Sequence, residues 1–415
     1  MEHPLWFVGI DWSSEYHQVH VMDASGAKRG ARRFPHSGAG LAALAEWLLQ
    51  VTGAPPEAIH VAIETPHGPV VETLMARGFR LYAINPKQLD RFRDRLSPAG
   101  AKDDRLDAEV LAGALRTDRH CLRPLQPLDP VVIELREWSR IAEEFSRERV
   151  RLGNRLRDQL WRYYPQMLEI ADDIAADWVL AMWKLAPTPR AAKRVRETTV
   201  ARLLKAHRIR RITAAELLQR LRKPPVTVAA GTTEAATAHI QILARQIPMI
   251  NRELRAAHAR IDQLIRRLME PLETEPGQLP EQRDAAILAS SPGAGRTAVA
   301  ALLTEAPQAV RQADYQALRC LTGAAPVTRQ SGKMTFVVRR LAVNRRLQNA
   351  VYHWALAAIR VDPVSRARYD ALRQRGHKHA RALRSVADRL LAVACAMLRN
   401  RTLFDPNRNA CHLAA

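Results

Sequence analysis

Residues 7–26, FVGIDWSSEYHQVHVMDASG, hold two apolar segments separated by a short polar stretch. The apolar runs at 5–11 and 17–23 each have the length and composition of a buried β-strand. Asp11 therefore stands at the end of the first strand. In a chain with 64 Lys and Arg residues, a carboxylate at that point needs a physical reason.

The composition is that of a globular protein with more than one domain. The chain has 415 residues, of which 47% are hydrophobic and 26% charged, enough for two or three cores. Its four cysteines form no CxxC pair, so neither a disulfide framework nor a zinc site is expected. No secretion signal or apolar stretch of membrane-spanning length is recognised, and we expect a cytoplasmic, nucleoid-associated protein.

Charge is the strongest global feature. Sixty-four basic residues against 42 acidic ones give a net charge of +22. A surplus of this size indicates a polyanionic partner, and nucleic acid is the first candidate.

After residues 7–26, the sequence pattern continues to predict strands and helices up to about residue 115. A third strand is expected at 28–34, followed by alternating helices and strands that end in the helical pattern DDRLDAEVLAGAL at 103–115. Three consecutive strands followed by strand and helix alternation predict a mixed sheet covered by helices. We therefore expect an α/β domain of RNase H-like order over residues 1–125.

Residues 126–283 read as an all-α middle region. An unbroken 3,4 spacing of apolar residues from Ile240 to Leu268 predicts the seam of a coiled coil or of a long helical hairpin, interrupted at Pro248. Strict heptads favour a partner helix, so self-association through this coiled coil is expected. Within the region, residues 190–223 carry twelve Lys and Arg against two Glu, and are interpreted as a basic helical insertion that contacts phosphates.

Four carboxylates are the candidate chemical centre. Asp11 and Glu64 end strands expected to be neighbours, and Asp104 and Asp107 lie three residues apart on one helical face. Such a cluster would repel itself unless Mg²⁺ or Mn²⁺ ions compensate the charge, and two such ions suit phosphodiester cleavage. Asp103 competes with Asp104, because Asp103 and Asp107 also share a face.

Other interpretations of these carboxylates stay open. Asp11 could cap a turn, and the acidic residues near 104 could simply favour a first helical turn. Actin-like ATPases open with a similar strand and Asp loop, but a second phosphate loop and a Gly-rich adenosine pocket are not visible in the sequence. The aromatic residues Trp6, Trp12, Trp161 and Trp183 are expected in cores, since they lie within apolar patterns.

Residues 284–415 are expected to form a mostly α-helical domain with an irregular centre. SPGAGRTAVAALL, with Gly293 and Gly295, could grip a phosphate through backbone N–H groups or could be a plain turn between helices. In GAAPVTRQSGKMTFVVRR, Ser331 lies in a Gly-flanked loop and could attack a phosphodiester. The cations that could bind nucleic acid around it are Arg329, Lys333, Arg339, Arg340, Arg345 and Arg346.

Together these motifs resemble the DEDD transposases of bacterial insertion sequences, the bridge-RNA-guided recombinases. The resemblance rests on GID, AIET, AKDDRLDAEVLA, SPGAGRTAVAALL and GAAPVTRQSGK in that order, over about residues 5–116 and 284–400. The family pattern Lys, one residue, Asp, two residues, Asp is met at 102–107 and favours Asp104 over Asp103. The basic segment 190–223 makes the middle longer than the family leads one to expect.

The resemblance implies a RuvC-like domain whose four carboxylates bind magnesium, an assembly segment, and a transposase domain. It implies that Ser331 forms a covalent phosphoserine intermediate with DNA in a site shared between subunits of a dimer or tetramer. It also implies a structured non-coding guide RNA that pairs with donor and target DNA. The alternatives are a RuvC-like, Holliday-junction-resolvase-like nuclease with water as nucleophile, and a non-catalytic nucleic-acid-binding scaffold.

Overall fold

The computed structural model describes residues 5–95, 103–122, 124–272, 277–332 and 334–406. The chain divides into two compact units, Met1–Pro127 and Leu128–Ala415. Within the described residues, no helix is both long and apolar enough to cross a membrane.

The first unit is built on a five-stranded sheet with the order β3-β2-β1-β4-β5. β1 pairs antiparallel with β2 and parallel with β4, while β3 and β5 form the two edges. The α/β domain with a mixed sheet is as expected from the sequence. The strands are β1 Trp6–Trp12, β2 Tyr16–Met22, β3 Lys28–Pro35, β4 Ile59–Ile63 and β5 Arg80–Ala83.

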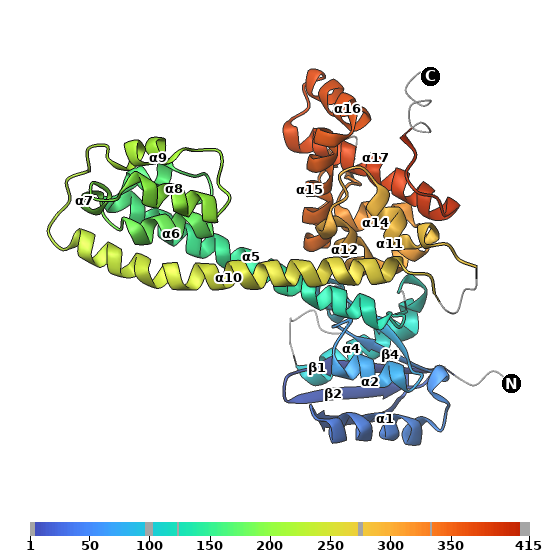
Figure 1. The fold of residues 1–415 in the computed structure, drawn as a ribbon. Coiled ribbons are helices and arrows are strands. Elements are labelled where there is room, and N and C mark those ends of the chain that lie inside the picture. Colours follow the sequence, from blue (N-terminus) through green and yellow to red (C-terminus); the bar gives the residue numbers. More distant parts are fainter. Residues whose placement is uncertain (1–4, 96–102, 123, 273–276, 333, 407–415) are drawn as a thin grey trace. The chain divides into compact units, whose positions relative to one another are not determined.

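Helices cover both faces of this sheet (Figure 1). One apolar core joins α1 and α2 to inward residues such as Val8 and Ile10, and a second joins α4 to residues such as Phe7 and Ala62. Each strand therefore buries alternate side chains in different layers. The helices are α1 Gly38–Thr52, α2 Pro69–Ala76, α3 Pro86–Arg93 and α4 Asp104–Asp118, with short 3₁₀ turns η1 Pro56–Ala58 and η2 Arg119–Cys121.

Gly9 sets the distance between β1 and α4. A Cβ atom built on Gly9 would lie 1.9 Å from the carbonyl oxygen of Ala108 and 2.6 Å from the amide nitrogen of Ala112. Only the absence of a side chain lets the helix backbone lie against the strand. Because Asp11 follows Gly9 by two residues on β1, this contact brings the strand end close to the start of α4.

The second unit is organised by two long helices, α5 Pro130–Tyr163 and α10 Thr232–Met269. They run antiparallel along each other, since Arg260 contacts Glu134 whereas Arg149 contacts Asn251 (Figure 1). α10 is continuous through Pro248.

The apolar seam of α10 is used inside the chain. Ile240, Leu243 and Ile247 pack with one part of α5, and Ile261, Leu264 and Leu268 pack with another. The hairpin alternative of the heptad pattern is the observed one. Self-association through this seam would require the hairpin to open.

Each end of the hairpin carries its own helical domain with a separate core. At one end lie α6 to α9, which include the basic segment 190–223 (Figure 1). These elements are η3 Pro165–Glu169, α6 Asp177–Leu185, α7 Pro189–Ala192, α8 Glu197–Ala206 and α9 Ala214–Leu221.

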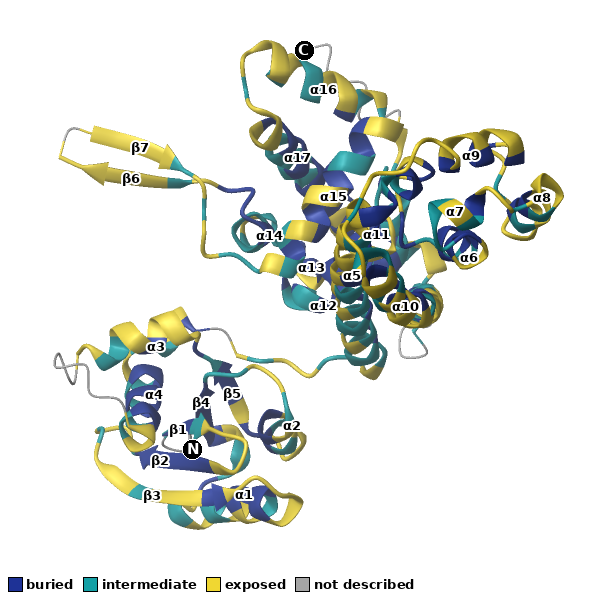
Figure 2. Ribbon diagram, turned by 90° about the vertical axis from the view of Figure 1, so that its left-hand side faces the viewer, coloured by how far each residue is buried: buried dark blue, intermediate teal, exposed yellow. Residues whose placement is uncertain are grey.

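The other end packs against the C-terminal helices. The expected irregular centre is an antiparallel β-hairpin of exposed residues that projects from the helices (Figure 2). The elements are η4 Pro280–Gln282, α11 Asp284–Ser290, α12 Arg296–Glu305, α13 Pro307–Arg311, α14 Tyr315–Thr322, β6 Val327–Ser331, β7 Met334–Val338, α15 Arg345–Val361, α16 Pro363–Gln374 and α17 His379–Asn400.

Candidate functional site

Asp11 and Glu64 lie at the same edge of the sheet. Ile10 is paired with Ile63 in the parallel register of β1 and β4, so the next residue of each strand, Asp11 and Glu64, lies level with the other. Strand alternation places Asp11 with Gly9 on the α4 side, as it does Glu64 with Ala62. Both acidic residues are half-buried.

Three further carboxylates lie at the N-terminal end of α4, in the same unit. Asp103 is the N-cap, and its side chain accepts a hydrogen bond from the Arg105 amide. Asp104 is the first helical residue, is exposed, and lies 3.7 Å from the Arg33 guanidinium. The Asp103 side chain thus caps the start of α4, and the Asp104 side chain is exposed beside Arg33.

Asp107 has a different environment. It is 4% exposed, and Arg93 of α3 donates from Nε to its Oδ1 at 2.6 Å. Arg93 also donates to Asp90 at 2.8 Å. The hydrogen bond to Asp107 raises the pKa of Arg93, so the cation is held firmly beside the buried carboxylate.

These carboxylates share an edge but do not form a closed ligand set. Within the described residues, no group of three or more His, Cys, Asp or Glu side chains is placed to hold a metal ion. Although Asp104 and Asp107 were expected on one helical face, each pairs with a different arginine: Asp104 with Arg33 and Asp107 with Arg93. Carboxylate oxygens are the right donors for Mg²⁺, but Arg93 already holds one oxygen of Asp107.

Two exposed aromatic residues adjoin the acidic edge. Trp12 is 45% exposed and Tyr16 is 46% exposed, and the Arg33 guanidinium lies 5.4 Å from the centre of the Tyr16 ring. The expectation that Trp12 belongs to a core is wrong, because the strand end turns it toward solvent. Its position after Asp11 and before the polar turn SSE was the signal in the sequence.

The other tryptophans divide in the same way. Trp161 near the end of α5 is 71% exposed, so its assignment to a core is also wrong, whereas Trp183 is 4% exposed in the core of the α6–α9 domain. Trp6 is half-buried beside the core of α1 and α2.

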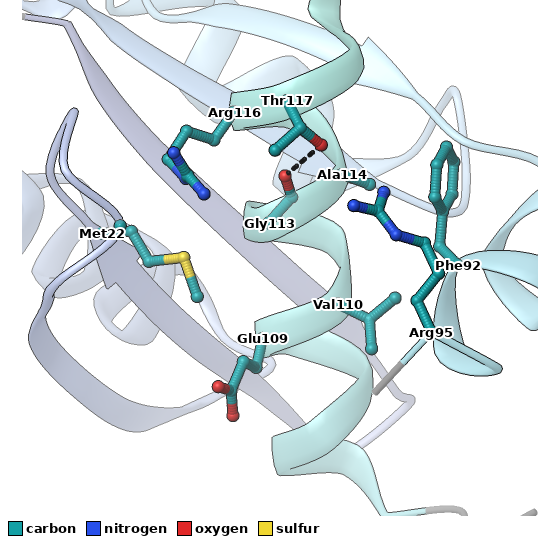
Figure 3. Close-up of a pocket in the computed structure, with 10 residues that line it drawn as sticks. Met22, Phe92, Arg95, Glu109, Val110, Gly113, Ala114, Arg116 and Thr117 are labelled. Carbon is teal, nitrogen blue, oxygen red and sulfur yellow. Dashed lines mark hydrogen bonds between the residues drawn. The ribbon is translucent and has the colours of Figure 1, made fainter. Parts of the chain in front are cut away.

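A surface cleft of about 240 Å³ lies along α4, on the α4 side of the sheet (Figure 3). Its polar lining comes from Glu109, Arg95, Arg116 and Thr117, the last of which donates to the Gly113 carbonyl at 3.1 Å. Its lining includes none of the four candidate carboxylates. The cleft therefore does not mark the acidic edge.

Ser331 is the last residue of β6, at the tip of the exposed hairpin (Figure 2). It pairs with Met334 across the turn, and Gly332 adopts a φ of 55°, which favours glycine. No hydrogen bond from a described residue engages its hydroxyl. Arg329 lies two residues earlier on the same strand, and Lys333 lies outside the described residues.

The arginines that follow the hairpin have different environments. Arg339 and Arg345 both donate to the Gln348 side chain, at 3.1 and 3.4 Å, while Arg346 forms an ion pair with Glu143 at 3.2 Å. The Nε atom of Arg340 is buried without a hydrogen-bond partner among the described residues. Arg346 is thus explained by packing onto α5, whereas Arg339 and Arg345 gather at the foot of the hairpin.

Two residues of α17 join this basic group. Burial, together with the neighbouring Arg339 and Arg381, lowers the pKa of Arg384. Arg381 and Arg384 were not singled out from the sequence, although the basic run HKHARALRS that contains them was visible. The sequence alone could not place the start of α17 beside the residue after β7.

The glycine turn before α12 has a packing explanation. Gly293 has a φ of 74°, and a Cβ atom there would lie 2.6 Å from the Ala358 amide nitrogen of α15. The Gly295 amide donates to the Gly293 carbonyl at 3.0 Å within the same turn. These contacts favour the plain turn over a phosphate grip.

The mixed sheet and the acidic residues at its edge define the first unit as an RNase H-like domain. Two family models match the chain: one described as a transposase covers residues 8–165, and one described as a transposase of the IS116/IS110/IS902 family covers residues 285–370. The two matches lie on either side of the α6–α9 domain.

Relatives agree with these models. The chain is 32% identical, over 97% of its length and 96% of the relative, to the mini-circle putative transposase for IS117 of Streptomyces coelicolor. It is 60% identical over 206 residues to the putative transposase y4uE of Sinorhizobium fredii, a match that covers 49% of this chain and 57% of that protein. The chain belongs to the IS110/IS116 family of insertion-element transposases.

Proposed function

We propose that the chain is the site-specific DNA recombinase of a mobile element and acts through Ser331. The observation that carries the proposal is the position of Ser331 at the tip of an exposed hairpin with arginines at its base. A nucleophile must reach a scissile phosphate that is held by a duplex, and a projecting strand end gives that access. Family membership supplies the class of reaction.

In the proposed step, the Ser331 oxygen loses its proton and bonds to phosphorus, while the bond from phosphorus to the 3′ or 5′ oxygen of a deoxyribose breaks. That oxygen takes up a proton and leaves as a hydroxyl group. The reverse reaction, with a hydroxyl of another strand as nucleophile, rejoins the DNA and releases the serine. The phosphodiester bond energy is conserved in the covalent link. Arg329, two residues before Ser331 on β6, is the candidate to stabilise charge on the phosphoryl oxygens.

Asp11, Glu64, Asp104 and Asp107 would hold the magnesium or manganese ions of the RNase H-like domain. Bound ions would polarise the phosphate and neutralise its charge. Asp11 and Glu64 supply oxygens from level positions on β1 and β4, and Asp104 supplies one from the exposed start of α4. Asp107 would contribute through its oxygen not held by Arg93.

The proposal extends to partners. A structured guide RNA would select donor and target DNA by base pairing, and more than one chain would assemble so that carboxylates and serine meet in one site. Because the α10 seam is buried against α5, assembly would use another surface. Sedimentation of the protein with and without the element's transcribed flanking RNA and its end DNA tests both partners.

A trapping experiment tests the central claim. Labelled element-end DNA, the flanking RNA and Mg²⁺ are incubated with the full chain, the protein is denatured, and DNA that migrates with protein is measured. The adduct is expected with the native chain and not with Ser331→Ala. Thr335→Ala is the matched control, since it removes another exposed hydroxyl from the same hairpin and should keep the adduct.

A metal-dependent nuclease is the second candidate, favoured by the carboxylates on the sheet edge. It would leave nicked DNA without an adduct, and Ser331→Ala would cut as well as the native chain. Asp11→Asn would abolish cutting in both cases while sparing most DNA binding. Retained cutting in Asp11→Asn would remove the carboxylate edge from either mechanism.

A further inference from the structure

The basic segment 190–223 carries exposed cations on the helices and turns of a folded domain. Four of its twelve cations are engaged inside the domain: Lys223 pairs with Glu169, Arg220 and Arg222 donate to backbone carbonyls, and Arg211 lies over the Trp178 ring. The side chains of the other eight are exposed and form no ion pair or hydrogen bond with a described residue: Arg190, Lys193, Arg194, Arg196, Arg202, Lys205, Arg208 and Arg210.

This surface is rigid in its construction. Val200 and Leu204 of α8 and Leu217 and Leu221 of α9 are buried in the domain's own core. Glu216, one of the two acidic residues of the segment, closes a capping box with Thr213 at the start of α9. The free cations are therefore displayed on packed helices and tight turns, and the segment is more than a solvated charged run.

Arg208 supplies an independent observation. The end of α8 forms a Schellman motif, in which the Arg208 amide donates to the Lys205 carbonyl and the Ile209 amide to the Leu204 carbonyl. Arg208 occupies the left-handed position of that motif with a φ of 56°. Glycine fits this position best, so an exposed arginine here indicates a use for the side chain beyond folding.

We propose that this surface of α7, α8 and the turn 207–213 is a second DNA-binding site, which grips the phosphate backbone of a double helix without reading its sequence. It contains the eight free cations and is built on a domain separate in its core from the Ser331 hairpin. Residues 190–223 contain no Phe, Trp or Tyr, so the segment offers no stacking platform for unpaired bases. The exposed Lys and Arg side chains of the segment are therefore suited to bind the phosphate backbone of a duplex.

The test measures binding of the full chain, in a Ser331→Ala background, to a labelled 30-base-pair DNA unrelated to any element end. The probe variant is Arg194→Gln/Arg208→Gly/Arg210→Gln. The control variant is Arg147→Gln/Arg252→Gln/Arg366→Gln, which removes the same charge from exposed arginines that already have acidic partners. Fluorescence anisotropy over a range of salt concentrations gives both affinity and its salt dependence.

We expect the probe variant to bind at least ten-fold more weakly at about 0.1 M salt, with a shallower salt slope by roughly two to three, since each lost phosphate contact removes about 0.9. The control should change affinity less than two-fold. Arg208→Gly alone should weaken binding while its melting temperature stays the same or rises, because glycine relieves the left-handed position. That combination separates loss of contact from loss of fold.

Three results would overturn the inference. Equal losses in probe and control would show a general charge effect, and unchanged affinity in the probe would show that the surface is not used. A probe that loses affinity only for a 30-base-pair RNA duplex would assign the surface to RNA. Because the DNA is unrelated and Ser331 is absent, these outcomes are independent of adduct formation, so this inference and the proposed recombinase chemistry can fail separately.

Discussion

Replacement of Gly9 by alanine tests how the first unit holds its acidic edge together. The added Cβ would lie 1.9 Å from the Ala108 carbonyl oxygen, about 1.5 Å short of the 3.4 Å at which ordinary contact begins. The contacted atoms at Ala108 and Ala112 belong to the α4 backbone and cannot rotate away. The helix must therefore move off β1.

The magnitude follows from overpacking. Insertion of a methyl group into a well-packed core typically lowers the free energy of unfolding by about 1–3 kcal/mol. Because the new methyl group on the central strand β1 would meet α4 backbone atoms, we expect a cost of about 3 kcal/mol, at the upper end of that range. Alanine also lowers the conformational entropy of the unfolded chain, and this stabilises the folded state by roughly 0.4–1 kcal/mol. We expect Gly9→Ala to destabilise the first unit by about 2 kcal/mol.

Hydrogen exchange read by mass spectrometry on the full chain measures this locally, because peptides from β1 and α4 report the opening free energy of the first unit alone. Gly113→Ala is the matched control: the same change on α4 meets nothing within 4 Å and should raise protection by up to about 1 kcal/mol, as expected for alanine in a helix. A Gly9→Ala chain with native protection in both elements would refute the close contact between β1 and α4.

Three further predictions concern single groups. Arg93→Gln should leave buried Asp107 without its partner and lower the stability measured for α4 by about 3 kcal/mol, whereas Asp107→Asn in the same chain should recover part of that loss in hydrogen exchange. Burial and the neighbouring Arg119 lower the pKa of His60 to about 4, so its stabilisation is present above pH 6.5 and is lost as pH falls, by roughly 2 kcal/mol between pH 7 and 5; urea unfolding of the first unit should show this slope, and His60→Asn should flatten it. Burial raises the pKa of Cys395 to about 11, so iodoacetamide at pH 8 should modify exposed Cys121 and leave Cys395 unlabelled until the chain is unfolded.

Local pattern was enough to predict the α/β sheet domain. Apolar alternation at 5–11 and 17–23, the turn residues between them, and the helical periodicity of 103–115 each act over a few residues, so their interpretation needs no knowledge of distant contacts. The pairing of β1 with β2 and of β2 with β3 also followed, since strands joined by tight turns pair in sequence. The pattern could not predict that α4 packs closely against Gly9, because that contact joins residues about 100 positions apart in the sequence.

The candidate site was predictable in position and not in detail. The sequence placed Asp11 and Glu64 at strand ends, and the register puts them level. It also gave Asp104 and Asp107 a common face, but the structure gives each a different arginine, because Arg93 arrives from α3 and Arg33 from β3. Which cation meets which carboxylate depends on packing between elements, and periodicity carries no information about that.

The heptad pattern of α10 shows the same limit at larger scale. A 3,4 repeat of apolar residues specifies that a helix will bury one stripe against another helix, and it does not specify whose helix that is. Here α5 covers the seam through contacts such as Arg260 with Glu134, because both helices belong to one chain and the domain between them, α6 to α9, turns the chain back. The α6–α9 domain, which contains the basic segment 190–223, is thus the connection between α5 and α10. Its core includes residues of both long helices, such as Leu156 of α5 and Ile240 of α10.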